Sequence, residues 1–220
     1  MFYSLFDSAY GVCGIVYRNP EDPRVIHIFL PRTRNDVKSR ILSMFPKSEE
    51  KNVPKVDELI SDIVRYLNGE PVNFTLDLLD LSVCYPFQLK VITTERTIPR
   101  GMAATYSRVA KQIETKGVRA VGNALARNPF PLVVPCHRAI RSDRTLGGFQ
   151  GGLEMKRQLL EMEGVKFDSK GRVSPQCILA DKNQLSKYPE LLPERHVANN
   201  SPGWLWRCWF SSSEDSSICW

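Results

Sequence analysis

The sequence lacks the features that place a chain in a membrane or an oxidising compartment. It contains no run of about 18 apolar residues, so no transmembrane helix is expected. Residues 1–17 are fairly apolar but carry Asp7 and no basic leader, which indicates strand material rather than a signal peptide. The six cysteines form no C-x-x-C pair, which argues against a zinc site and a disulfide framework. We expect an intracellular protein, cytoplasmic or (in a eukaryote) nuclear, with no membrane partner.

The chain also has no large excess of charge of one sign. Its 30 Lys and Arg residues against 24 Asp and Glu residues give a formal net charge of +6. This balance favours a polyanionic partner only weakly, because many proteins of similar charge bind none. The 220 residues suffice for one large domain or two small ones.

Residues 1–84 are expected to form a small α/β scaffold domain. The runs at 14–17 and 25–30 are typical of strands, and the turn-rich residues 19–23 separate them. Residues 56–67 have helical spacing and are followed by an Asn-Gly pair. No residue of this part stands in a pattern that indicates chemistry.

Residues 85–180 are expected to form a second domain with a helix-turn-helix. A helix is predicted over 87–97, and Tyr106 begins an apolar stripe that predicts the next one. After Gly117, residues 118–126 predict a further helix, and the two helices with their glycine-containing turn fit a helix-turn-helix.

The end of this second part and the residues that follow it differ in character. Residues 131–134 are predicted to be a short buried strand leading to Cys136, and a glycine-rich loop at 147–152 precedes a helix over 153–163. Residues 181–220 are treated as an appended tail of unpredicted fold, since all four tryptophans lie in its last 17 residues.

Cys136 is the candidate nucleophile. A thiol attacks as thiolate, and a free cysteine with a pKa of about 8.5 is mostly protonated at neutral pH. His137 is its neighbour, but adjacent residues of a strand point to opposite faces, so the chain must turn at Cys136. Glu163 falls within an apolar helical arc, where a carboxylate needs a partner, and it is the candidate that orients His137. A contact between Lys156 and Glu163 is the rival.

In this order and spacing, the motifs of residues 85–180 resemble the O6-alkylguanine-DNA alkyltransferases, also called methylated-DNA–protein-cysteine methyltransferases. The first domain resembles that family only loosely, and the tail has no counterpart in it. The matching stretches are 86–88 (PFQ), 98–101 (IPRG), 105–107 (TYS), 119–122 (RAVG), 128–131 (NPFP), 133–138 (VVPCHR), 151–153 (GGL) and 159–164 (LLEMEG).

The resemblance implies an α+β fold, with a small ribonuclease H-like N-terminal domain followed by a winged-helix-like domain. It implies a monomer that binds double-stranded DNA containing O6-alkylguanine through the minor groove and flips the damaged base out of the duplex. The alkyl group passes irreversibly to Cys136 in a single turnover, and neither a metal nor another cofactor is needed.

The family's catalytic roles fall on five residues of this chain. Cys136 is the acceptor and His137 the base, which acts through a water. Glu163 orients His137, Asn128 hydrogen-bonds the local backbone, and Tyr106 donates toward N3 of the guanine.

The base and DNA contacts that the resemblance implies fall on Arg119, Ala120, Gly122, Phe149, Gln150 and Arg138. Arg119 fills the space that the flipped base leaves. On the same helix, Gly122 costs about 1 kcal/mol relative to alanine, which close approach to a minor groove explains. Val118, Val121 and Leu125 form the side suited to packing.

Two positions of the base pocket depart from the family pattern. Phe149 stands where tyrosine is frequent, so stacking is kept and a hydroxyl is lost. Gln150 stands where serine is frequent. Binding survives if only its backbone N–H is used, whereas large adducts are excluded if its side chain narrows the pocket.

Two other functions are weighed against alkyl transfer. A lesion-binding module without repair activity lacks the acceptor cysteine, whereas Cys136 is present here. A cysteine hydrolase built on Cys136, His137 and Glu163 explains neither the helix-turn-helix nor Arg119, and it predicts turnover rather than inactivation after one event.

Overall fold

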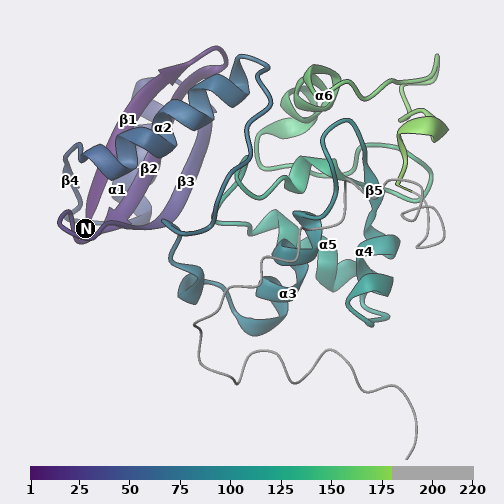
Figure 1. The fold of residues 1–220 in the computed structure, drawn as a ribbon, viewed down its shortest axis with the longest axis horizontal. Helices are drawn as coiled ribbons and strands as arrows, with labels where there is room; N and C mark the ends of the chain where they lie inside the picture. The colour runs from purple at the N-terminus through teal and green to yellow at the C-terminus, as the bar shows by residue number, and fades with distance from the viewer. Residues whose placement is uncertain (180–220) are drawn as a thin grey trace, which may run out of the picture.

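The first part of the chain builds a four-stranded sheet with the strand order β3-β2-β1-β4. In the computed structural model, which describes residues 1–179, the first three strands are antiparallel and β4 pairs in parallel with β1 (Figure 1). The strands predicted at 14–17 and 25–30 are confirmed, since they lie within β2 and β3. The strands are β1 (Phe2–Ser8), β2 (Gly11–Arg18), β3 (Arg24–Arg32) and β4 (Glu49–Glu50).

Two helices pack on opposite faces of this sheet. The alternation of β2 sends Val16 toward α1 (Arg34–Met44), while Ile15 points toward α2 (Pro54–Leu67). The helix predicted at 56–67 is confirmed as α2, which crosses the near face of the strands in Figure 1. The sequence reasoning missed α1, because its buried residues are only Val37 and Ile41 and they give no strong helical stripe.

The second part is mainly helical and contains the predicted helix-turn-helix pair. Helices α4 and α5 are separated by residues 113–117, and a short parallel pair of strands, β5 and β6, lies beside them. The helices expected at 87–97, from Tyr106, at 118–126 and at 153–163 are all present, with ends shifted by at most two residues. The elements are α3 (Pro86–Glu95), β5 (Ala104–Thr105), α4 (Tyr106–Gln112), α5 (Val118–Ala126), β6 (Ala139–Ile140) and α6 (Gly152–Met162).

The strand expected at 131–134 is a buried turn instead. Pro131 and Val134 form an isolated bridge across it, and Leu132 has a φ of 75°. The backbone N–H of Val134 donates to Phe130 O at 2.8 Å, which closes the turn. Burial was predicted correctly, but a four-residue run that begins with a proline and is followed by another lacks the N–H groups of a strand.

A single hydrophobic cluster joins the sheet part to the helical part. Ile28 of β3 and Tyr66 of α2 belong to the same cluster as Phe130, Val134 and Leu159. The backbone of β3 also reaches across, because Ile28 N–H donates to Pro129 O at 2.8 Å. The start of the Cys136 segment is therefore packed against the sheet.

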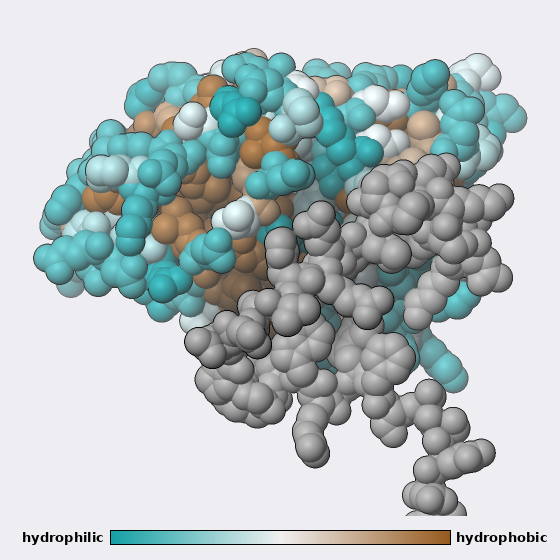
Figure 2. Space-filling model, in the orientation of Figure 1, coloured by the Kyte–Doolittle hydropathy of each residue, from teal (hydrophilic) through white to brown (hydrophobic). Residues whose placement is uncertain are grey.

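The outer surface is mostly hydrophilic. In Figure 2, hydrophobic residues on the visible face are seen mainly in a recess of the sheet part. No helix within residues 1–179 is long and apolar enough to cross a membrane. The expected tail, residues 181–220, lies outside the described residues, as does residue 180.

Gly14 of β2 allows the close approach of α1. An added Cβ would lie 2.8 Å from Ile41 Cδ1 and 2.9 Å from Val37 Cγ1. We expect Gly14→Ala to lower the free energy of unfolding by about 1–2 kcal/mol, because the core is overpacked. Urea denaturation followed by circular dichroism measures this change.

Gly122→Ala is the matched control for that substitution. An added Cβ at Gly122 meets nothing within 4 Å, and the residue lies inside α5. Its free energy of unfolding should rise by about 0.5–1 kcal/mol, because alanine favours a helix. Equal effects of the two substitutions would contradict the packing argument.

Candidate active site

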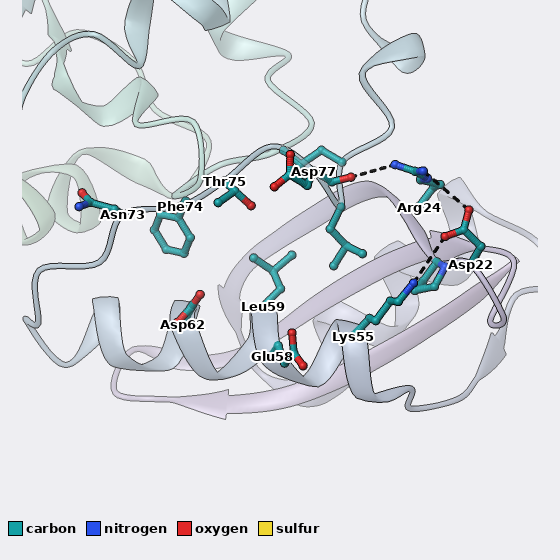
Figure 3. Close-up of a pocket in the computed structure, with 13 residues that line it drawn as sticks. Asp22, Arg24, Lys55, Glu58, Leu59, Asp62, Asn73, Phe74, Thr75 and Asp77 are labelled. Atoms are coloured by element: carbon teal, nitrogen blue, oxygen red, sulfur yellow. Dashed lines mark hydrogen bonds and ion pairs between the residues drawn. The ribbon is translucent and has the colours of Figure 1, made fainter. Parts of the chain in front are cut away.

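A pocket of about 430 Å³ in the sheet part carries no reactive constellation. It lies between α2 and residues 73–79 (Figure 3), and no cysteine or histidine lines it. Its charges pair with one another, since Asp22 lies 3.7 Å from both Arg24 Nη2 and Lys55 Nζ. Arg24 also donates to the backbone oxygen of Asp77 at 2.8 Å.

A second pocket, of about 380 Å³, contains the candidate nucleophile. It is formed where α4, α5, the Cys136 turn and the glycine-rich loop meet. Five predicted site residues line it together, and Arg141, which the sequence reasoning missed, is also present. The lining residues are Tyr106, Gly122, Leu125, Ala126, Cys136, Arg141, Gly147, Gly148, Phe149 and Gln150.

Cys136 begins a single 3-10 turn, Cys136–Arg138, which is the change of direction that the sequence required. Its side chain is buried, and burial raises the pKa of the thiol to about 11. The hydrogen bond with Asn128, whose Nδ2 lies 3.2 Å from the sulfur, lowers this pKa in part. The thiol is thus protonated at neutral pH and needs a base before it can react.

Asn128 holds the nucleophile turn in place. Its Nδ2 also donates to Val134 O at 3.1 Å, and its Oδ1 accepts from the backbone N–H of Phe130 at 3.0 Å. The side chain is fully buried, so these groups have no access to water. The predicted contact of Asn128 with the local backbone is present.

His137 and Glu163 meet at the back of the turn. His137 Nε2 lies 3.2 Å from Glu163 Oε1, and both side chains are fully buried. Burial lowers the pKa of His137, so the imidazole is neutral at pH 7. Burial also disfavours the charge of Glu163, but its contacts with His137 and Arg138 outweigh that penalty and lower the pKa of the carboxyl.

The other side of the imidazole faces the interior. No residue within 1–179 accepts or donates a hydrogen bond at His137 Nδ1, which is buried. The ring of Phe149 lies edge-on to His137, with a centroid distance of 6.2 Å. Phe149 therefore connects the pocket wall to the base, and its missing hydroxyl does not change this packing.

Arg138 occupies a different place from the expected DNA contact. Its Nε and Nη2 donate to the two oxygens of Glu163 at 2.9 and 2.6 Å, and its Nη1 donates to Ile98 O at 2.6 Å. Only 12% of its side chain is exposed. The expectation that Arg138 binds DNA is wrong for this arrangement, because all three nitrogens of its guanidinium are engaged inside the protein.

Lys156 does not pair with Glu163, so the rival contact is absent among the described residues. Its Nζ donates to the backbone oxygens of Ala139, Leu146 and Gly148 at 2.6, 2.5 and 3.2 Å. Burial lowers the pKa of Lys156 to about 8. The side chain thus fastens the glycine-rich loop to the segment that follows Cys136.

Helix α5 presents small side chains and one arginine at its surface. Arg119 and Ala120 are exposed, and Gly122 is partly exposed beside the pocket. Val121 and Leu125 are buried as expected, whereas Val118 is 39% exposed. Val118 was wrongly assigned to the packing side, because the first residue of α5 extends beyond the helices that cover it.

Tyr106 and Gln150 border the opening of the pocket. The Tyr106 hydroxyl lies 3.5 Å from Gly148 O, and burial raises its pKa to about 12, so it remains a donor at neutral pH. The Gln150 side chain donates to Asn128 O at 2.8 Å. Gln150 therefore ties the glycine-rich loop to the end of α5, and its side chain does not point freely into the pocket.

Tyr66 and Glu95 also belong to the site, although no sequence signal singled them out. The Tyr66 hydroxyl donates to Glu163 Oε1 at 2.6 Å, but on α2 the residue reads as part of an apolar face. Glu95 is completely buried, and burial raises its pKa to about 8, so it is mainly neutral. Within residues 1–179, no group of three or more His, Cys, Asp or Glu side chains is placed to hold a metal.

Comparison with known proteins gives a consistent result. The profile "6-O-methylguanine DNA methyltransferase, DNA binding domain" matches residues 86–165. A methylated-DNA–protein-cysteine methyltransferase of Methanothermobacter thermautotrophicus is 47% identical over 113 residues, which are 51% of this chain and 64% of that protein. A protein of the same name from Saccharolobus solfataricus is 43% identical over 102 residues, 46% of this chain and 65% of its own. The chain thus spans somewhat less than two thirds of these relatives.

Two solved structures resemble the whole described fold. The O6-methylguanine-DNA methyltransferase of Pyrococcus kodakaraensis is 30% identical, with a TM-score of 0.58 over 74% of this chain and 100% of the other. The Mycobacterium tuberculosis OGT in complex with DNA is 28% identical, with a TM-score of 0.60 over 74% of this chain and 92% of the other.

Asn128→Ala tests the anchoring of the nucleophile turn. The substitution leaves Phe130 N–H and Val134 C=O buried without their partner, so the free energy of unfolding should fall by about 2–4 kcal/mol. It also removes a hydrogen bond that lowers the Cys136 pKa, so labelling of Cys136 by iodoacetamide in folded protein should slow at pH 8. Asn123→Ala, at an exposed position of α5, should change neither quantity. Faster labelling of the folded Asn128 variant would contradict this role.

Proposed function

The chain belongs to the O6-alkylguanine-DNA alkyltransferase family, and we propose from this premise that it repairs DNA by moving an alkyl group onto Cys136. The observation that carries the proposal is a buried thiol in a pocket of about 380 Å³, beside a helix that exposes Arg119. A pocket of this kind takes one flipped base, and the helix supplies the group that replaces it in the duplex.

The transfer is a displacement at the alkyl carbon. Neutral His137 takes the thiol proton through a water, and the sulfur attacks the carbon attached to O6. A sulfur–carbon bond forms as the carbon–O6 bond breaks, and the electron pair moves into the guanine. Tyr106 donates toward N3 and balances the charge that develops there. The product is a thioether that water does not hydrolyse, so each molecule acts once.

The buried position of Cys136 supports this single use. A pKa of about 11 keeps the sulfur as an unreactive thiol until a base acts on it. His137 is neutral because burial lowers its pKa, so it is ready to accept a proton at pH 7. Glu163 then stabilises the imidazolium that forms.

Binding to double-stranded DNA is assigned to α5. Its exposed side has Arg119, Ala120 and Gly122, and these small side chains suit close approach to a minor groove. An open space around Gly122 supports this assignment, because packing within the protein does not require a glycine there. Unstacking a base costs a few kcal/mol, and insertion of Arg119 offsets part of that cost.

The finer description of the fold is part of the same proposal. We assign residues 1–84 to a ribonuclease H-like domain and residues 85–180 to a winged-helix-like domain. An antiparallel sheet with a helix on each face supports the first assignment, and the consecutive helices α4 and α5 support the second.

Intact-mass spectrometry after incubation with a duplex containing O6-methylguanine tests the transfer. We expect one methyl group to replace one hydrogen, to map to Cys136, and to be absent in Cys136→Ala. Cys177→Ala, which removes another buried free cysteine, should still be methylated. An unmodified chain that binds the lesion would indicate a recognition module, and release of product with repeated turnover would indicate a hydrolase.

Arg119→Ala tests the insertion into the duplex. The rate of methyl transfer from duplex DNA should fall at least tenfold, because the flipped state loses the group that stabilises it. The rate with free O6-methylguanine base should change little, since no flipping is needed. Arg34→Ala, at an exposed position of α1 in the sheet part, controls for the loss of one charge. Equal losses on duplex and free base would exclude the insertion role.

A further inference from the structure

Tyr66 contacts both members of the His137–Glu163 pair, although it lies in the sheet part of the protein. Its hydroxyl oxygen is 2.6 Å from Glu163 Oε1 and 3.1 Å from His137 Nε2. The residue is 2% exposed, and its hydroxyl is buried with these two groups. The same hydroxyl therefore belongs to two hydrogen bonds, and it has only one hydrogen to give.

The charge of Glu163 decides where that hydrogen lies. Arg138 binds both carboxylate oxygens and keeps Glu163 ionised, so Glu163 can only accept hydrogen bonds. The short contact of 2.6 Å is then a donation from the Tyr66 hydroxyl to the carboxylate. Burial beside Glu163 raises the pKa of Tyr66 well above its usual value, so the hydroxyl keeps its hydrogen.

The direction of this bond determines which nitrogen of His137 carries the proton. With its hydrogen on Glu163, the Tyr66 oxygen can only accept in its contact with Nε2. Glu163 Oε1, at 3.2 Å, is also only an acceptor for Nε2. Both neighbours of Nε2 thus require an N–H there, which leaves the lone pair of neutral His137 on Nδ1.

We propose that Tyr66 is a positioning residue, which fixes the Nε2–H tautomer of His137 by donating to Glu163 and accepting from Nε2. The inference deepens the proposed alkyl transfer, and its catalytic consequence rests on that function. The neutral base then presents Nδ1 to the thiol proton in every molecule. Without the hydroxyl, Glu163 alone selects the tautomer through a longer contact.

Arg100 fixes the end of α2 that carries Tyr66. Its Nη2 donates to Gly69 O at 2.7 Å and to Met162 O at 3.2 Å, and its Nη1 donates to Glu70 O at 3.1 Å. The guanidinium also lies over the Tyr66 ring, 5.8 Å from its centroid. One side chain thus ties the end of α2 to the residue before Glu163, so Tyr66 and Glu163 are held as a unit.

Nitrogen NMR of the whole chain labelled with ¹⁵N-histidine tests the proposal without any substitution at the site. Spectra that correlate ring protons with ring nitrogens identify the tautomer, and His137→Gln assigns the signals among the three histidines. At pH 7.5, a value about one unit above the ordinary histidine pKa, we expect Nε2–H to dominate. A dominant Nδ1–H form in the unaltered chain would overturn the proposal.

Tyr66→Phe then removes the single hydroxyl. We expect the Nδ1–H form to become visible in the spectrum, and the first-order rate of methyl transfer from bound duplex to fall about tenfold, a part of the usual contribution of a positioned base. The affinity for an O6-methylguanine duplex should stay within twofold, because Tyr66 is buried away from α5. An unchanged tautomer and an unchanged rate would overturn the proposal.

Tyr17→Phe is the matched control. Tyr17 is another buried tyrosine of the sheet part, and its hydroxyl donates to Lys51 O at 2.6 Å. Its loss should affect stability only and leave the His137 tautomer and the transfer rate unchanged. If Tyr17→Phe slows transfer as much as Tyr66→Phe does, the Tyr66 effect is structural and the proposal fails. A chain that transfers no methyl group with the expected tautomer would contradict the repair function alone.

Discussion

The ionised carboxylate of Glu163 is the interaction on which the site depends. It lies at the C-terminal end of α6 and binds Arg138 through both oxygens, while its Oε1 also contacts His137 and Tyr66. A buried carboxylate costs several kcal/mol to desolvate unless its partners satisfy it. Because these partners come from the Cys136 turn and from α2, the need to satisfy one charge holds three separate segments together.

The same burial explains why the thiol is unreactive by itself. Removing Cys136, His137 and Lys156 from water disfavours the charged form of each, which raises the cysteine pKa and lowers the other two. The cysteine and the histidine are therefore both neutral in the resting protein. A proton must move between them for the sulfur to attack, and the geometry around His137 sets the direction of that movement.

Loops rather than regular elements supply most of the pocket, and buried polar side chains give them a fixed shape. Lys156 satisfies three backbone oxygens along the chain that follows the Cys136 turn, Asn128 holds the turn itself, and Gln150 joins the loop to Asn128 O. Backbone groups in a buried loop need such partners, since no neighbouring strand supplies them. The site is thus rigid although few of its residues lie in helices or strands.

The sequence by itself determined the nucleophile, its neighbouring base and the two helices beside them. Cys136, His137 and Glu163 stand in a pattern whose spacing is recorded along the chain, and helical periodicity is a local property that a single segment reveals. The exposed side of α5 followed from the same periodicity, apart from Val118, which lies at the helix end.

Only the tertiary structure decided the partners that come from distant parts of the chain. Tyr66 reaches Glu163 across 97 positions, and on the apolar face of α2 it cannot be told from a core residue. Arg138 reads as a surface cation in the sequence, yet the fold turns it inward because Glu163 needs a countercharge. Residues 131–134 form a turn for a similar reason, since prolines remove the hydrogen bonds of a strand and packing alone holds the segment.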